Sequence, residues 1–199
     1  MARQLEADAG RYVTEIIEIV IHNILYLRQI YPPELFVRRK KFNVPVFQCA
    51  SDTLNNYISG ITAEIGKELR RLQKIALVIL DGEEALERYS FILKAHNRDI
   101  EAEWQTPENL GSRLRAALVK LNTIDAVLPS VTPSVIIETG PLENIQDGAR
   151  VTSPSPEEWE PATSNKPAAL EKSQDKTFHV KPIDIGKFQL TLEIAEFNK

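Results

Sequence analysis

Residues 12–30, YVTEIIEIVIHNILYLRQI, decide the fold. Apolar residues fall here in two adjacent series with a spacing of four, which is typical of one face of an α-helix. The series are Ile16, Val20 and Ile24, and Ile17, Ile21 and Leu25. Together they make a surface wider than the seam of a coiled coil, so we predict a central helix that other elements cover on most sides. Glu15, His22 and Arg28 interrupt the apolar run and argue against a membrane span.

Length and composition indicate the class of protein. A chain of 199 residues with a net charge of −4 accommodates one domain plus an irregular segment. The acidic balance argues against a domain built mainly to hold nucleic acid. The single Cys49 excludes an internal disulfide and fits a reducing compartment. No secretory signal opens the sequence, and we expect an intracellular, soluble protein.

The segment after the central helix begins with a proline pair. Pro32 and Pro33 predict that the helix ends near Ile30, because proline lacks an amide donor and disfavours helical geometry in the preceding residue. A short strand follows, and it leads into the basic run Arg38–Lys41. We interpret this run as a solvated strand edge, with contact to phosphate as the alternative. The next apolar residues, 42–46, re-enter the core.

Residues 24–46, ILYLRQIYPPELFVRRKKFNVPV, resemble the HORMA-domain accessory subunits of the translesion DNA polymerase zeta, the mitotic arrest-deficient 2-like protein B family. That family has a helix ending in Leu-Tyr-x-Arg-x-x-Tyr-Pro, then an aliphatic-Phe pair, a basic run and an aromatic-Asn-Val-Pro-Val segment. The matching residues are Leu25, Tyr26, Arg28, Tyr31, Pro32, Leu35, Phe36, Arg39, Lys40, Lys41, Phe42, Asn43, Val44, Pro45 and Val46. The length of this match makes it more specific than a short motif.

Apolar periodicity predicts further helices and strands along the chain. The expected helices run from Asp52 to about Leu72 and from Thr106 to Pro129, and the expected strands are Ile75–Leu80, Arg88–Lys94, Ser134–Glu138, Phe178–Ile185 and Phe188–Ala195. The first of these strands should be buried on both faces, because it is continuously apolar. The second alternates in residue type and should return antiparallel to the first.

The composition changes after Thr139, where proline, serine and glutamate become frequent. We therefore predict a single α+β domain over residues 1–199, with a core at about 8–140 and a C-terminal segment at about 141–199 that includes a flexible stretch at about 147–176. The resemblance implies that three main helices pack on a mostly antiparallel sheet, and that the C-terminal segment is the safety belt of a HORMA domain.

Catalytic and metal-binding patterns are absent from the sequence. His22, His96 and His179 are far apart and have no ligand-spaced partners. We interpret His22 and Cys49 as structural core residues. The sequence contains no glycine-rich loop for phosphate. We therefore expect a protein that is not an enzyme and that uses no metal or cofactor.

The family resemblance implies a non-catalytic adaptor that works in the nucleus during DNA damage tolerance. Its belt would enclose a short peptide of the catalytic subunit of DNA polymerase zeta and bridge it to the deoxycytidyl transferase scaffold. Such a peptide adds as a strand, so that backbone hydrogen bonds supply affinity. The resemblance also implies pairing with itself or another HORMA protein and remodelling by an AAA+ ATPase. From the interrupted apolar run and the acidic charge we expect no membrane contact and little direct nucleic-acid binding.

The same resemblance assigns residues to these contacts. Tyr57 and Trp159 match aromatic residues that pack on the partner peptide, and Val135 and Ile137 lie on the strand offered to it. The second-partner surface matches at Val180, Gln189, Leu190 and Thr191, although the family's well-known form has tyrosine where Thr191 stands. Arg115 matches an arginine of the surface through which HORMA domains pair.

Simpler interpretations stay open for several of these residues. Tyr57 could be ordinary core, Trp159 a linker residue and Arg115 a solvated helix arginine. For the whole protein, the alternatives are a HORMA adaptor of the spindle checkpoint or meiotic chromosome axis, a small enzyme of unfamiliar chemistry, and direct nucleic-acid binding through residues 38–41.

Overall fold

The computed structural model describes residues 2–69, 74–82, 84–95, 107–123, 134–140, 151–152, 176–186 and 188–197. Its helices are α1 (Ala2–Leu27), α2 (Asp52–Glu68) and α3 (Pro107–Asn122), with a short 3-10 helix η1 (Pro33–Leu35). Its strands are β1 (Phe36–Lys41), β2 (Val44–Cys49), β3 (Lys74–Asp81), β4 (Glu84–Ala95), β5 (Ser134–Gly140), β6 (Val151–Thr152), β7 (Lys176–His179), β8 (Ile183–Ile185) and β9 (Phe188–Glu196).

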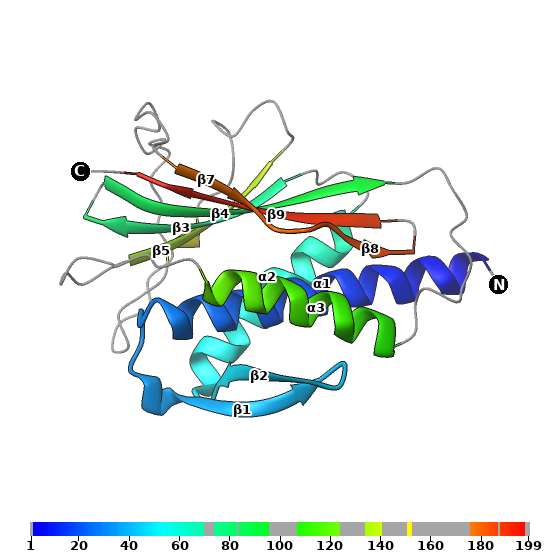
Figure 1. The fold of residues 1–199 in the computed structure, drawn as a ribbon, viewed down its shortest axis with the longest axis horizontal. Helices are drawn as coiled ribbons and strands as arrows, with labels where there is room; N and C mark the ends of the chain where they lie inside the picture. The colour runs from blue at the N-terminus through cyan, green and yellow to red at the C-terminus, as the bar shows by residue number, and fades with distance from the viewer. Residues whose placement is uncertain are drawn as a thin grey trace.

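These elements form three layers (Figure 1). The first is a seven-stranded sheet with the order β6-β5-β3-β4-β9-β7, to which β8 adds by pairing with β9. The helices cover one face of this sheet, and the β1–β2 hairpin lies on the far side of the helices. All described strand pairs are antiparallel. The predicted α+β fold, with three helices on a mostly antiparallel sheet, is confirmed.

Helix α1 lies in the middle layer, and its apolar series is buried as predicted. Ile16, Ile17 and Ile24 are each 0% exposed. The helix begins at Ala2 and ends at Leu27, somewhat before the predicted end near Ile30. The early end has a local cause. The amide of Ile30 donates to the carbonyl of Leu25, that of Gln29 donates to Tyr26, and Gln29 has φ 51°, which together make a Schellman C-cap.

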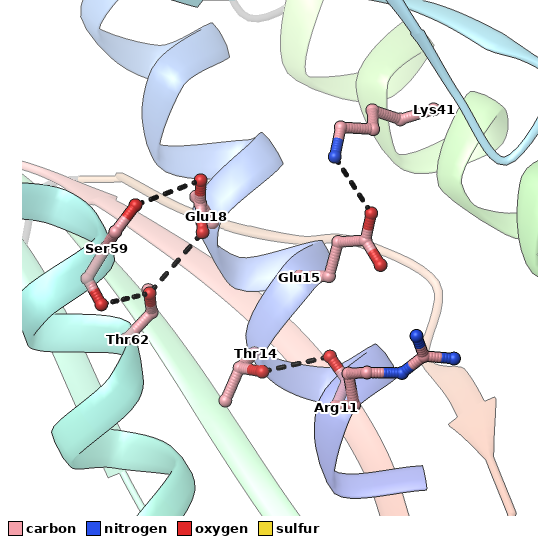
Figure 2. Close-up of polar contacts among 7 residues, drawn as sticks. All are labelled: Arg11, Thr14, Glu15, Glu18, Lys41, Ser59 and Thr62. Atoms are coloured by element: carbon pink, nitrogen blue, oxygen red, sulfur yellow. Dashed lines mark hydrogen bonds and ion pairs between the residues drawn. The ribbon is translucent and has the colours of Figure 1, made fainter. Parts of the chain in front are cut away.

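The polar residues of α1 fasten it to its neighbours. Glu15 forms an ion pair with Lys41 of β1, with 3.1 Å between Oε1 and Nζ. Glu18 lies within 3.5 Å of the hydroxyl groups of Ser59 and Thr62 on α2 (Figure 2). Because these groups are partly exposed, each contact contributes little free energy, and their main effect is to fix the orientation of the helix.

A buried polar network joins the end of α1 to β4. Nε of Arg28 donates to Oε2 of Glu87 at 2.9 Å and to the hydroxyl of Tyr89 at 2.7 Å, and that hydroxyl donates to the same carboxylate. Burial, reinforced by the Glu87 charge, raises the pKa of Tyr89 well above its usual value. The phenol therefore stays neutral and keeps its proton for Glu87.

Strand β4 returns antiparallel to β3, as the sequence predicted. Its residues Arg88, Ser90 and Ile92 are 4%, 4% and 7% exposed. Both faces of β4 are therefore covered, as the sequence predicted only for the neighbouring β3, which is buried from Ile75 to Leu80.

The tip of the β1–β2 hairpin is held by a helix. Phe42 and Asn43 form a two-residue loop with φ values of 47° and 60°, a left-handed geometry typical of type I′ turns. Gly111 of α3 approaches this loop so closely that a Cβ there would lie 2.0 Å from the carbonyl oxygen of Phe42. Tyr12 of α1 adds an edge-on contact with the Phe42 ring at 5.7 Å between centroids.

His22 and Cys49 are both core residues, as predicted. Nδ1 of His22 accepts a hydrogen bond from the backbone amide of Cys49 at 3.4 Å. Nε2 has no hydrogen-bond partner among the described residues, although the side chain is 2% exposed. Burial lowers the pKa of His22 to about 4.

The close approach of α3 to the hairpin gives a prediction about Gly111. The Gly111→Ala substitution forces backbone apart, and we expect it to lower the free energy of unfolding by at least about 2 kcal/mol. Gly60→Ala is the matched control, because Gly60 is also inside a helix but its Cβ would meet nothing within 4 Å. That change should stabilise the protein by about 0.5–1 kcal/mol. Denaturant unfolding measures the free energy of unfolding of both variants. Equal changes in the two variants would contradict the close approach of Gly111 to the hairpin loop.

The burial of His22 predicts a pH dependence. Its pKa is about 4 in the folded protein against 6.5 when exposed, so the unfolded state binds the proton more tightly. Stability should therefore be complete above pH 6.5 and fall as the pH drops toward 4, by up to about 3 kcal/mol. His22→Gln should remove this part of the pH dependence, whereas His179→Gln, at an exposed site, should keep it. The test is the free energy of unfolding measured across this pH range. If it falls with pH equally steeply in His22→Gln and in the wild type, His22 is not the source of the pH dependence.

Candidate partner-binding surfaces

Strand β5 lies near one end of the seven-stranded sheet. It pairs along its whole length with β3, from Ser134 opposite Leu80 to Gly140 opposite Lys74. On its other side, the described residues pair with it only at Ile136 and Ile137, where the two-residue β6 lies. Most of that edge of β5 is therefore available in the described part of the chain.

Val135 and Ile137 occupy positions of known register on β5. They lie opposite Ile79 and Leu77 of β3, which are each 0% exposed. The strand that sequence reasoning assigned to the partner peptide is thus present at the expected position. The contact itself stays a prediction.

The C-terminal strands lie on the opposite side of the β3–β4 pair. Strand β9 pairs with β4 over nine positions, from Glu87 opposite Glu196 to Ala95 opposite Phe188. Strands β7 and β8 both pair with β9. Strands β5 and β6 therefore lie on one side of the β3–β4 pair, and the next described strand, β7 from Lys176, joins the sheet on the other side.

A polar clasp fastens these returning strands to α3. Asp184 of β8 forms an ion pair with Arg113, with 2.7 Å between Oδ2 and Nη1. Its other oxygen accepts a hydrogen bond from the Gln189 side-chain amide at 2.8 Å. The Arg113 and Asp184 side chains are 26% and 32% exposed. We call this set of three residues the Asp184 clasp.

The predicted second-partner residues divide into two groups. Val180 and Leu190 are each 3% exposed and belong to the main core. Gln189 and Thr191 are half-buried and alternate along β9 with the buried Leu190 and Leu192. Gln189 and Thr191 are therefore the more exposed pair and Val180 and Leu190 are core residues, and the contact of all four with a second partner stays a prediction.

Tyr57 lies half-buried on α2 and packs against the core. Burial, and to a smaller extent the neighbouring Tyr31, raises the pKa of Tyr57 to about 12. It is therefore a neutral phenol at the rim of the core, and its proposed contact with a peptide stays a prediction. Trp159 lies outside the described residues.

Arg115 is exposed on α3, as predicted for a pairing surface or a solvated helix arginine. Its Nη2 lies 3.5 Å from the carbonyl oxygen of Asn43 in the hairpin loop. Val119, one turn further along the same helix, is 58% exposed. Exposed apolar and cationic groups thus lie on the outer side of α3.

The described residues contain no group of three or more His, Cys, Asp or Glu side chains arranged to hold a metal ion. His96 lies outside the described residues, while His22 and His179 occur on separate elements, α1 and β7. None of the described helices is both long and apolar enough to span a bilayer.

Sequence reasoning missed the residues of the two polar links, which are the Arg28–Glu87–Tyr89 network and the Asp184 clasp. Arg28 and Glu87 are 59 positions apart, and Arg113 and Asp184 are 71 apart. One signal was available for the first link, because Arg28 is the only lysine or arginine in the largely apolar stretch 12–30, and such residues are rarely buried without a partner.

Comparison with known proteins gives the same fold. The HORMA domain model matches residues 11–188. A chain of a structure titled "Crystal Structure of Mitotic Checkpoint Complex" aligns with a TM-score of 0.71 and 19% identity, covering 96% of this chain and 97% of that one. The Caenorhabditis elegans HTP-2 bound to a HIM-3 closure motif aligns with a TM-score of 0.66 and 12% identity, covering 94% and 89%.

Comparison of sequences relates the chain to named proteins. The Gallus gallus "Mitotic spindle assembly checkpoint protein MAD2B" is 34% identical over 144 residues, which are 68% of this chain and 66% of that protein. The Drosophila melanogaster "DNA polymerase zeta subunit 2" is 30% identical over 125 residues, 61% of each. The chain thus spans just under two thirds of the length of these relatives. The Saccharomyces cerevisiae "Mitotic spindle checkpoint component MAD2" is 28% identical, covering 88% of this chain and 91% of that one.

The predicted resemblance is therefore confirmed, both by the fold and by relatives that include a polymerase zeta subunit. With a family match over most of its length, the chain belongs to the HORMA domain family.

Proposed function

We propose that this protein is a non-catalytic adaptor that encloses an extended peptide between the edge of β5 and the residues that follow Gly140. The observation that carries the proposal is the strand order, which puts β5 and β9 on opposite sides of the β3–β4 pair. The chain that connects them starts at one side of the sheet and ends at the other. A peptide on the edge of β5 would lie under that connection.

The edge of β5 suits a partner strand. A strand edge presents unpaired amide and carbonyl groups that can bind another extended backbone. Within the described part of the chain, β6 uses only two positions of this edge. A peptide held there and crossed by a returning chain can leave only when β9 separates from β4, so slow dissociation is expected.

The relatives support a choice of partner. A relative named as a polymerase zeta subunit favours the catalytic subunit of DNA polymerase zeta as the source of the peptide. On this proposal Gln189 and Thr191 offer the second surface to the deoxycytidyl transferase scaffold, and Arg115 serves pairing with itself or another HORMA protein. The protein would then act in the nucleus during DNA damage tolerance, with an AAA+ ATPase to reopen the belt.

A second candidate is an adaptor of the spindle checkpoint or of the meiotic chromosome axis. It is favoured by the similarity to the yeast checkpoint component along most of both chains. Because both candidates use the same enclosure, only the sequence of the captured peptide separates them. A panel of candidate segments from polymerase, checkpoint and axis proteins therefore belongs in the test below.

A reversible crosslink between β4 and β9 tests the enclosure. Lys94 and Gln189 lie directly opposite in the register, and Lys94→Cys/Gln189→Cys should form a disulfide while Cys49 stays buried. The peptide is placed between two folded tags that cannot thread under a belt. Crosslinking before the peptide is added should block capture, and crosslinking afterwards should slow release at least about tenfold. Reduction should reverse both effects.

The reduced form of the same variant is the control for that experiment. Because Gln189→Cys also removes the hydrogen bond between Gln189 and Asp184, the capture and release rates of the reduced variant, rather than those of the wild type, are the reference for the crosslinked form. If the protein crosslinked in advance still captures the tagged peptide, the peptide does not lie under the belt and the proposal fails.

The Asp184 clasp should contribute to holding the belt closed. Asp184→Asn removes the ion pair with Arg113, and we expect it to weaken docking by about 1 kcal/mol, since the pair is partly exposed. Amide hydrogen exchange in β8 and β9 should become faster by about fivefold. The swap Arg113→Asp/Asp184→Arg should restore much of the protection. The control is Glu64→Gln, which removes a more exposed ion pair with Lys67 on α2 and should leave exchange in β8 and β9 unchanged.

A further inference from the structure

We propose that the outer edge of the β1–β2 hairpin binds the phosphodiester backbone of a nucleic acid through Arg38, Arg39 and Lys40. This inference goes beyond the peptide adaptor role, because it concerns a different layer of the molecule. The hairpin lies on the far side of the helices from the seven-stranded sheet (Figure 1). We call these three residues the basic strip.

The basic strip is exposed and lies at an open edge. All three side chains are exposed, and among the residues that the structure describes β1 pairs only with β2. The next cation, Lys41, is already ion-paired with Glu15 of α1. Arg39 and Lys40 have no ion-pair partner in the described part of the chain, so their charge is available to a ligand.

The pairing pattern shows which backbone groups face the open edge. The two-residue loop closes on the pair of Lys41 with Val44, which in such hairpins is hydrogen-bonded, and the pattern then alternates. Arg38 and Lys40 therefore direct their amide and carbonyl groups away from β2. Pro45 lies opposite Lys40 and agrees with this alternation. A backbone amide at that position would point away from β1, so the pairing with β1 does not need the N–H group that proline lacks. Outward backbone amides are common phosphate contacts.

Arg38 is held in a defined position. Its guanidinium carbon lies over the Phe47 ring, 5.5 Å from the centroid. The Phe47 ring stacks in turn on Tyr26 of α1, with 3.6 Å between centroids and 16° between planes. A planar cation supported in this way can pair with phosphate and can also stack on a base.

The arrangement of charge favours a nucleic acid over an acidic peptide. Arg38 and Lys40 lie on one face of β1 about 7 Å apart, and Arg39 lies on the other face. A peptide strand at this edge would need acidic side chains at consecutive positions to meet them all. A phosphodiester chain carries a charge on every repeat and can turn it toward either face.

The hairpin is rigid enough to bind without a large ordering cost. Its loop, with two non-glycine residues at positive φ, is held by the contacts of Gly111 and Tyr12 with Phe42. A charged edge also discourages unwanted strand pairing, but that role requires only charge. It does not account for the fixed position of Arg38 over Phe47.

The net charge of −4 limits what such a site can do. The rest of the surface repels polyanions, so binding should be confined to the basic strip, weak and sensitive to salt. A flexible single strand can follow a short strip while avoiding the acidic surface, whereas a rigid duplex cannot. We therefore expect single-stranded nucleic acid to bind more tightly than duplex.

Fluorescence anisotropy with the full chain tests the proposal. The probes are single-stranded DNA, single-stranded RNA and duplex DNA of about 25 nucleotides. At low salt we expect a dissociation constant in the micromolar range, with a slope of log affinity against log salt of about −2, as for three phosphate contacts to a single strand. Preference for DNA or RNA identifies the natural source, and tighter binding of duplex would overturn the single-strand assignment.

Matched variants decide whether the strip carries the binding. Arg38→Gln/Arg39→Gln/Lys40→Gln should weaken affinity at least about tenfold and abolish the salt dependence. Lys67→Gln/Lys120→Gln/Lys181→Gln removes the same charge at exposed sites elsewhere and should change affinity by less than about twofold. Equal losses in the two variants would overturn the proposal, because they would indicate bulk charge alone.

Two further measurements separate this site from its rivals. Polyglutamate of equal charge should displace the labelled oligonucleotide poorly. If it displaces the probe as well as unlabelled oligonucleotide does, the ligand is an acidic peptide and the choice of nucleic acid is overturned. The strip variant should still capture the peptide at β5. Loss of oligonucleotide binding with peptide capture retained therefore identifies two independent sites.

Discussion

The pairing of β9 with β4 is the interaction on which the rest of the structure depends. It spans nine positions, and it places Leu190, Leu192 and Ile194, each at most 6% exposed, against the core that surrounds α1. Burying three such side chains contributes about 5–9 kcal/mol. Strand β9 is therefore an integral part of the sheet and of the core.

The sequence predicted those parts of the fold that follow from local pattern. The four-residue spacing located α1, and strict alternation located β9, because each element has one face in the core. It could not predict the end of α1, since the Schellman cap uses Gln29 rather than glycine. Nor could it show that Arg88 and Ser90 are buried, because alternation of residue types does not reveal whether a second face is covered.

The candidate site shows the same division between local and distant information. A family resemblance could place Gln189 and Thr191 on one strand, and alternation could have separated them from Leu190. Pairs such as Arg113 with Asp184 require the register of distant elements, which a single sequence does not contain. The Arg28–Glu87–Tyr89 network is similar, because Arg28 alone indicates that it needs a partner, but only the fold shows that Glu87 and Tyr89 are buried with it.

Helix α3 connects the two surfaces that this fold presents. Gly111 contacts the hairpin loop, and Arg113, two positions along, holds Asp184 of the returning strands. The two contacts differ in kind. The first is a backbone contact that tolerates no added atom, whereas the second is a partly exposed ion pair of small free energy. Since the hairpin is held rigidly and the clasp weakly, separating the C-terminal strands from α3 need not disturb the basic strip. The energy that keeps those strands in place resides mainly in the β4–β9 pairing and the side chains it buries.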